Sequence, residues 1–317
     1  MRKLIALITL LLSTLSIYAE SYSVFYKGDS CGLIDENRKI ISAPVYEFIR
    51  ITVQGCFECV KSDGAVDFFD EKFNKVFSFS YVTFMWQYSE HEWIIHKNGE
   101  IGLTLIDIKT KQTTKGIEVK SKDNCPTFIN NIGVILTYYD EMQKYGYTIA
   151  TRNGKTIVSN IAQADMMYSE DLIPVLFFNG KSGYLDYEGN LVIEVPLYED
   201  YRMEGLRISP SLNYRFHEGV AFIQTAEDQW YLLDKKGSKK EVPPEYNFAT
   251  RRYSKGLTVV EDKEHKFGYM DKDFKLAIPC KFERAESFEG KYAAVVYQGK
   301  DGVIDKDGNI YFCEEFK

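Results

Sequence analysis

Residues 302–309 read Gly-Val-Ile-Asp-Lys-Asp-Gly-Asn, and residues 183–190 read Gly-Tyr-Leu-Asp-Tyr-Glu-Gly-Asn. A third stretch, residues 268–271, repeats the beginning of this unit as Gly-Tyr-Met-Asp. Each copy is a glycine, two hydrophobic residues, an aspartate and then a turn. A recurring unit of this kind predicts a repeat architecture, because each copy buries its apolar surface only against its neighbours.

The residue just before each turn marks the copies along the chain. It is an aspartate in all but one of them, where a threonine takes its place. The marked positions are Asp35, Asp70, Asp107, Thr151, Asp186, Asp234, Asp271 and Asp305. Most neighbouring positions are about 36 residues apart, and two longer gaps of about 44 and 48 residues indicate insertions.

Each copy also has the pattern of an antiparallel meander. Pairs such as Asn153-Gly154 and Asp307-Gly308 supply the positive φ that a two-residue hairpin needs. The strands that begin the copies are apolar at consecutive positions, as in residues 134–136 and 293–297, which indicates burial on both faces. We therefore predict an all-β fold of tandem three- to four-stranded antiparallel meanders in a propeller-like ring. An open β-repeat solenoid is the alternative.

The N-terminus has the pattern of a secretory signal peptide. Arg2 and Lys3 precede an unbroken apolar stretch, residues 4–12, and Ala19 lies at the expected cleavage point. The apolar segment is shorter than the roughly 20 residues that a membrane-spanning helix needs. We predict a signal peptide over residues 1–19 and one β-repeat domain of about eight units over residues 20–317. The mature chain is expected to be exported (periplasmic, cell-surface or secreted) and to have no membrane span.

The charge of the chain bears on its partners. The formal net charge is -7, and basic and acidic residues are interspersed. Binding to nucleic acid requires a clustered basic face, so we expect no nucleic-acid partner. Basic pairs such as Arg251-Arg252 lie beside turns and are interpreted as solvated loop charge.

At its C-terminal end the chain resembles a known repeat family. Residues 267–271 read Phe-Gly-Tyr-Met-Asp, residues 278–282 read Ile-Pro-Cys-Lys-Phe, and residues 288–290 read Phe-Glu-Gly. This order is similar to that of the bacterial WG-repeat family, and a looser match begins at residues 32–35. The tryptophan that gives the family its name is missing before each glycine. The resemblance implies a β-repeat array with a binding role, and it brings no catalytic residues.

Three motifs invite a chemical interpretation and are better explained by structure. Cys56 and Cys59 form a C-x-x-C in a strand-like run, without the helix N-terminus that a redox pair uses. His91 and His96 are five residues apart in a strand-like run, which places them on opposite faces. Residues 305–309 resemble a calcium loop but lack its later glutamate, so turn capping explains the aspartate. We predict no catalytic residues, no metal site and no cofactor.

The longest insertion, between Ile193 and Glu218, is the place where we expect a ligand. Its aromatic and cationic side chains are of the types enriched at binding hot spots. They are Tyr198, Tyr201, Arg202, Arg207, Tyr214, Arg215 and Phe216. The alternative is that these side chains pack the loop onto its own repeat.

Together these observations predict a non-catalytic, exported WG-repeat protein that acts as a protein-interaction scaffold. A carbohydrate or cell-envelope binding module is the alternative, because 23 tyrosines and 21 phenylalanines offer rings that stack on sugars. A second alternative is a hydrolase or lyase with an axial site, which needs inward-facing acids and histidines from different units. The expected partner is a protein or a glycan.

Overall fold

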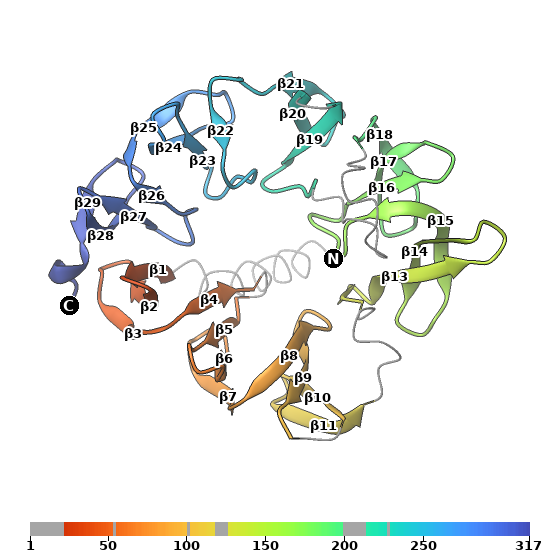
Figure 1. Ribbon diagram of the computed structural model, residues 1–317, viewed down its shortest axis with the longest axis horizontal. Helices are drawn as coiled ribbons and strands as arrows, with labels where there is room; N and C mark the ends of the chain where they lie inside the picture. The colour runs from red at the N-terminus through yellow and green to blue at the C-terminus, as the bar shows by residue number, and fades with distance from the viewer. Residues whose placement is uncertain (1–21, 53–54, 100–101, 118–125, 199–213, 227–228) are drawn as a thin grey trace, which may run out of the picture. The chain divides into compact units, whose positions relative to one another are not determined.

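The computed structural model describes residues 22–52, 55–99, 102–117, 126–198, 214–226 and 229–317 (Figure 1). The predicted signal peptide, residues 1–19, lies outside this part of the chain. Within the described residues there is no α-helix, and the one helical element is the short 3-10 helix η4 (Cys313–Glu315). All other elements are β-strands, as the repeat pattern predicted. By their internal contacts the residues form two compact units. Unit 1 comprises Met1–Glu118, Glu245–Thr250 and Ser254–Lys317, and unit 2 comprises Val119–Pro244 and Arg251–Tyr253.

Unit 1 contains antiparallel sheets of three or four strands, in which strands consecutive in sequence are neighbours. The sheets are β1–β3, β4–β7, β8–β11, β22–β25 and β26–β29. The strands are β1 (Tyr22–Lys27), β2 (Ser30–Asp35), β3 (Ile40–Tyr46), β4 (Phe48–Ile51), β5 (Phe57–Val60), β6 (Val66–Phe69), β7 (Lys75–Phe79), β8 (Val82–Gln87), β9 (Glu92–Lys97), β10 (Leu103–Asp107), β11 (Gln112–Ile117), β22 (Asn247–Phe248), β23 (Thr258–Glu261), β24 (Phe267–Met270), β25 (Leu276–Phe282), β26 (Arg284–Ala285), β27 (Ala293–Tyr297), β28 (Lys300–Ile304) and β29 (Ile310–Phe312).

Unit 2 contains the meanders of the fourth, fifth and sixth repeats. Its strands are β12 (Phe128–Ile129), β13 (Ile132–Tyr139), β14 (Lys144–Thr151), β15 (Thr156–Ala164), β16 (Ile173–Phe177), β17 (Ser182–Leu185), β18 (Leu191–Glu194), β19 (Val220–Ala226), β20 (Gln229–Asp234) and β21 (Lys239–Glu241). Strands β12–β18 form one seven-stranded sheet, because the long strand β15 pairs with β14 at its beginning and with β16 at its end. The predicted meanders are therefore present, with two of them merged.

The aspartate of the repeated unit caps the turn that follows it. Asp305 Oδ1 accepts hydrogen bonds from the backbone N–H groups of Asp307 and Asn309, each at 3.0 Å. The same pair of bonds, to the second and fourth residues onward, recurs at four other marked positions. They are Asp35, Asp70, Asp234 and Asp271. The repeated aspartate is thus explained by turn formation, as its short polar side chain favours.

The second repeat is buried on both faces. Cys59 packs with Leu33 of the first repeat, whereas Cys56 packs with Trp93 of the third. Both thiols are free, and burial raises the pKa of each, that of Cys56 to about 11. The two thiols therefore pack in separate core clusters, and burial disfavours the thiolate form of each.

The first and last repeats pack against each other within unit 1. Strand β1 contacts β27 and β28 (Figure 1), and the core between them contains Phe25 and Tyr292. The chain end continues this contact, because Ile40 N donates to Lys317 O at 2.6 Å and Lys317 N donates to Arg38 O at 3.3 Å. In an open stack the first and last repeats would be the furthest apart, so this contact favours a propeller over a solenoid.

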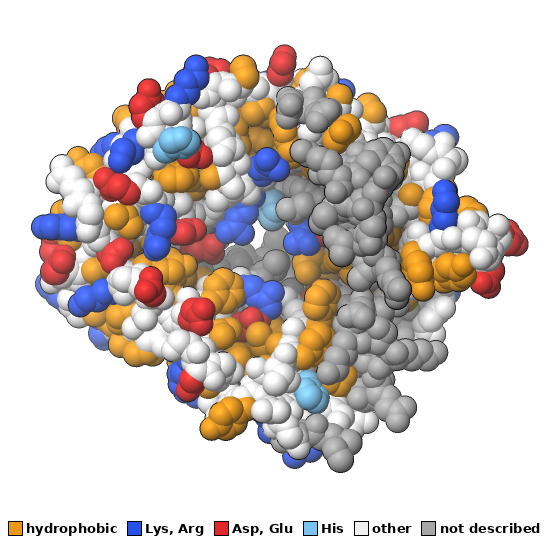
Figure 2. Space-filling model, viewed as in Figure 1, with side chains coloured by type: hydrophobic (Ala, Val, Ile, Leu, Met, Phe, Trp, Pro, Cys, Tyr) orange, Lys and Arg blue, Asp and Glu red, His pale blue; other side chains and the backbone are white. Residues whose placement is uncertain are grey.

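Charged side chains of both signs are interspersed over the described surface in Figure 2. Of the described helices, none is long and apolar enough to cross a membrane.

Candidate functional site

The two described ends of the predicted binding insertion meet in unit 2. The Tyr214 hydroxyl donates to Tyr198 O at 3.3 Å, and Tyr198 N donates to Gln224 O of β19 at 2.8 Å. From β17, the Tyr184 hydroxyl donates to Tyr214 O at 2.7 Å. The ends of the insertion are therefore fixed to two strands of adjacent repeats, a rigid base of the kind on which binding loops are usually built.

Two of the predicted binding residues are part of the core. Tyr214 and Phe216 are buried, and the Phe216 ring meets the Tyr184 ring edge to face, with centroids 4.8 Å apart. These rings pack onto their own repeats, which was the alternative interpretation for them. Three of the other predicted residues lie outside the described residues: Tyr201, Arg202 and Arg207. A ligand-binding role for the insertion stays a prediction.

Arg215 joins the sixth repeat to the fifth. Its Nε and one terminal nitrogen donate to the two carboxylate oxygens of Asp165, at 2.9 and 2.5 Å. Asp165 is wholly buried and also accepts hydrogen bonds from the backbone N–H groups of Met166 and Met167, at 2.6 and 3.3 Å. A bidentate guanidinium with two further donors satisfies a buried carboxylate, so this pair fastens two repeats.

Beside this pair lies an aromatic and cationic surface that the sequence interpretation missed. The Arg251 guanidinium carbon lies 4.0 Å from the centroid of the Trp230 ring, in the geometry of a cation–π interaction. Trp230 in turn meets the Tyr214 ring edge to face, with centroids 6.2 Å apart. Arg251 is exposed and has a φ of 45°, a left-handed conformation that few non-glycine residues adopt. We refer to Tyr198, Tyr214, Trp230 and Arg251 as the aromatic ladder.

The residues of this surface are visible in the sequence but lie in separate segments. Trp230 is in a strand of the sixth repeat, and Arg251 follows that repeat, so only the fold brings them together. Arg251 and Arg252 were interpreted as solvated loop charge, and both are exposed. The stacking of Arg251 on a tryptophan adds a contact that this interpretation did not include.

His217 lies between charged groups of both signs. Burial lowers the pKa of His217, and the nearby cations Arg252 and Arg215 lower it further. The carboxylates of Glu170 and Asp165 act in the opposite direction. The imidazole is therefore neutral at neutral pH.

Glu170, the second acid near His217, is also engaged. Its carboxylate accepts hydrogen bonds from Gly219 N at 3.2 and 3.0 Å and forms an ion pair with Lys235 Nζ at 3.1 Å. Within the described part of the chain, no group of three or more His, Cys, Asp or Glu side chains lies close enough together to hold a metal ion. The arrangement around His217 is one of paired charges.

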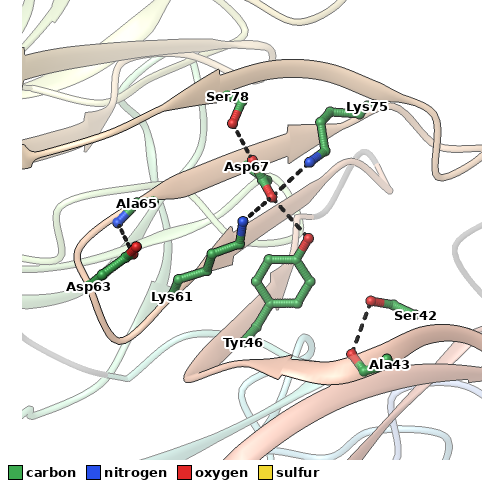
Figure 3. A network of polar contacts seen from close by, with 9 residues as sticks. All are labelled: Ser42, Ala43, Tyr46, Lys61, Asp63, Ala65, Asp67, Lys75 and Ser78. Carbon is green, nitrogen blue, oxygen red and sulfur yellow. Dashed lines mark hydrogen bonds and ion pairs between the residues drawn. The ribbon is translucent and has the colours of Figure 1, made fainter.

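A second buried carboxylate, in unit 1, has a different set of partners (Figure 3). Asp67 of β6 is wholly buried and accepts hydrogen bonds from Tyr46 Oη at 3.0 Å, Ser78 Oγ at 2.5 Å and Lys75 Nζ at 2.9 Å. Lys61 Nζ lies 3.3 Å from the same carboxylate. Burial would raise the pKa of Asp67, but the hydrogen bonds from Ser78, Lys75 and Tyr46 outweigh it and lower the pKa to about 2. Since Tyr46 belongs to the first repeat, this network also fastens neighbouring repeats.

Comparison with solved structures supports the class of fold. Apo AztD from Citrobacter koseri is similar over 92% of this chain and 92% of its own, with a TM-score of 0.50 and 12% identity. Dihydro-heme d1 dehydrogenase NirN matches over 95% of this chain and 72% of its own, with a TM-score of 0.49 and 14% identity. The C-terminal WD40 domain of Sif2 matches over 90% and 92%, with a TM-score of 0.47 and 10% identity. At 12% identity the likeness to AztD shows the fold alone: an all-β, propeller-like array of antiparallel meanders.

The repeats themselves have a family match. The WG containing repeat family matches residues 32–57 and 267–300. This match confirms the resemblance at both of these stretches. No match was found among curated proteins.

Proposed function

We propose that the chain is an exported, non-catalytic repeat scaffold that binds a protein partner through the aromatic ladder of unit 2. The observation that carries this proposal is the exposed Arg251 guanidinium over the half-buried Trp230 ring, which packs edge to face on the buried Tyr214 ring. Tryptophan, tyrosine and arginine are the residues that contribute most at protein interfaces. A cation held over a ring is also partly ordered before binding, which lowers the entropy lost when a partner docks.

The use of charged and nucleophilic groups elsewhere supports a binding role over a catalytic one. The buried acids Asp67 and Asp165 are occupied by donors that join repeats. The buried thiols have raised pKa values, as at Cys31, where burial raises the pKa to about 11. Catalysis by these groups would require breaking contacts that hold the repeats together.

The proposed partner presents an acidic segment to the ladder. Arg215 and Lys235 are offset by Asp165 and Glu170, whereas the neighbouring Arg251 adds exposed positive charge to a chain of formal net charge -7. A local excess of cations on an acidic protein favours partners of opposite charge, because complementary potentials speed association and exclude wrong partners.

Site-specific photocrosslinking in the cell that produces the chain tests this proposal. A photoreactive p-benzoylphenylalanine replaces Gln229, an exposed residue next to Trp230, and a matched control carries it at Lys306 on an exposed turn of unit 1. We expect one discrete protein adduct from position 229, absent from position 306, with an acidic segment at the crosslink. Arg251→Glu should reduce the adduct by about ten-fold, since a central hot-spot residue contributes at least that factor. Equal adduct patterns at the two positions, or none, would contradict the proposal.

Export is a separate part of the proposal and has its own test. The basic residues, apolar stretch and small residue within positions 1–19 support it. We expect a C-terminally tagged chain to be recovered outside the cytoplasm with Glu20 as its first residue, by mass spectrometry. Recovery from the cytoplasm with Met1 to Ala19 still attached would contradict export and leave the binding proposal untouched.

A further inference from the structure

The hairpin of strands β13 and β14 in unit 2 extends beyond its own sheet. Its ladder runs from Ile132 opposite Thr151 to Tyr139 opposite Lys144, with eight consecutive pairs and no irregularity. The next strand, β15, pairs with β14 no further toward the tip than Tyr147. The tip of the hairpin is therefore a two-stranded projection.

Two tyrosines lie side by side on this projection. Tyr138 and Tyr145 are directly opposite each other in the ladder, with ring centroids 4.9 Å apart and ring planes inclined by 58°. Both are exposed, by 43% and 53%. Because side chains alternate along a strand, the pair lies on the same face as Leu136 and Tyr147, which belong to or pack against the core. On this face of the hairpin, the side chains are therefore packed near the sheet and exposed at the tip.

The opposite face of the tip is anchored. The Tyr139 hydroxyl donates to Tyr147 O at 2.7 Å and accepts a hydrogen bond from Asn160 N at 2.9 Å. The Tyr139 ring also meets the Phe178 ring edge to face. A Cβ at Gly146 would lie 2.8 Å from the Phe178 ring, so glycine allows this close approach. With its other face fixed, the hairpin holds the two exposed rings in place before any ligand arrives.

The surroundings of the pair are polar. The Tyr138 hydroxyl donates to Gln143 Oε1 at 3.2 Å, and Gln143 Nε2 donates to Asp140 O at 2.7 Å, which orients the Tyr138 ring. Within the described part of the chain, the Tyr145 hydroxyl has no hydrogen-bond partner. Asp140 and Glu141, in the turn at the tip of the hairpin, are exposed. In Figure 2 hydrophobic side chains gather over the β13–β15 strands, with charged side chains at the edge of that patch.

We propose that the Tyr138–Tyr145 pair is a carbohydrate-binding platform. A sugar ring has an apolar face edged by hydroxyl groups, and a tyrosine ring has an apolar face with a polar tip. A platform of two tilted rings with a free hydroxyl, next to a polar turn, fits that chemistry. A protein hot spot is instead surrounded by contacts that exclude water, whereas this pair stands on a projecting tip with polar neighbours. The site is separate from the aromatic ladder, so it adds a second ligand to the proposed scaffold.

Affinity gel electrophoresis of the mature chain tests the platform. The gels contain laminarin, xylan, mannan or dextran, and sedimentation with isolated peptidoglycan covers an insoluble envelope glycan. We expect retardation by at least one of these probes. The double variant Tyr138→Ala/Tyr145→Ala should bind that probe about ten-fold more weakly, since both stacking surfaces are lost. Tyr145→Phe, which keeps the ring and removes the free hydroxyl, should retain most of the binding.

The matched control is Tyr81→Ala, because Tyr81 is a more exposed tyrosine, at 72%, that lies in unit 1. It should bind the probe as the unchanged chain does. Equal thermal unfolding of all variants shows that they are folded. The platform is overturned if no probe is retained by the unchanged chain, if the double variant binds as well as the control, or if the double variant loses a protein adduct instead. The adduct from position 229 does not depend on these tyrosines, so the two proposals fail separately.

Discussion

Asp67 in unit 1 and Asp165 in unit 2 are both wholly buried carboxylates that join consecutive repeats, yet they are held differently. Asp67 is shared among two hydroxyl groups and two lysines, whose side chains are 47% and 36% exposed. Asp165 depends on one guanidinium, that of Arg215. The comparison shows that a buried carboxylate can be stabilised by several side-chain donors, which share the interaction, or by a single guanidinium.

The second difference concerns what surrounds each acid. Of the two lysines that hold Asp67, Lys61 lies in the turn before β6 and Lys75 begins β7 (Figure 3), and both side chains are partly exposed. Arg215 directly follows Tyr214, which belongs to the aromatic ladder and meets the Trp230 ring. In unit 2, the Arg215–Asp165 pair that joins two repeats therefore also helps to position the aromatic ladder.

The largest effect is expected when the single donor of Asp165 is removed. Arg215→Met leaves a buried carboxylate with only two backbone donors, and we expect the free energy of unfolding to fall by about 4 kcal/mol. Urea unfolding followed by tryptophan fluorescence measures this loss. The control Lys235→Met breaks a partly exposed pair, with Glu170, and should cost less than about 1 kcal/mol. Equal losses of unfolding free energy for Arg215→Met and Lys235→Met would contradict the special role of the Arg215–Asp165 pair.

A smaller loss is expected from Asp67→Asn. The two lysines left without a carboxylate can turn to water, so the cost is limited to lost hydrogen bonds and packing, about 2 kcal/mol. Fluorescence of Trp86 and Trp93, in a Trp230→Phe background, reports this change in unit 1. Asp63→Asn is the matched control, because Asp63 accepts a single backbone hydrogen bond at an exposed turn. A loss of unfolding free energy as large as that of Arg215→Met would mean that water does not solvate the two lysines in the variant.

The Asp67 network also predicts a pH dependence. The pKa of Asp67 is lowered to about 2 in the folded chain, and an unfolded aspartate has a pKa of about 3.9. A lowered pKa contributes stability that is present above about pH 4 and is lost as the pH falls toward about 2, and its size is roughly 2 kcal/mol. The difference in unfolding free energy between the unchanged chain and Asp67→Asn should therefore shrink over this range. A difference that stays constant from pH 7 to pH 2 would contradict the assignment.

The smallest effect on stability is expected at the ladder. Arg251→Glu removes an exposed cation–π contact and should change the unfolding free energy by about 0.5 to 1 kcal/mol. Its effect on the crosslinked adduct from position 229 should be far larger, about ten-fold. A variant that loses stability and keeps the adduct would place Arg251 among the structural residues.

Local pattern was enough to predict the meanders but not the surfaces. Turns such as residues 305–309 form from a few neighbouring residues, and the alternation of apolar strands and glycine turns is visible along the sequence. The merging of the fourth and fifth repeats through β15 was missed, since it depends on how far one strand continues.

Contacts between repeats require the packed fold. Tyr46 and Asp67 lie in different repeats, as do Asp165 and Arg215, and nothing in their spacing links them. The Tyr138–Tyr145 pair depends on the register of the β13–β14 hairpin. For the insertion, the binding role stays a prediction, and Tyr214 and Phe216 fill the core.

The most direct test measures stability and partner binding together for Asp67→Asn and Arg251→Glu. The account predicts that Asp67→Asn lowers the unfolding free energy by about 2 kcal/mol and leaves the adduct from position 229 intact. Arg251→Glu should have the opposite outcome, with the adduct lost and stability nearly unchanged. If both variants lose stability and adduct in proportion, the division between fastening residues inside the repeats and binding residues on the ladder is contradicted.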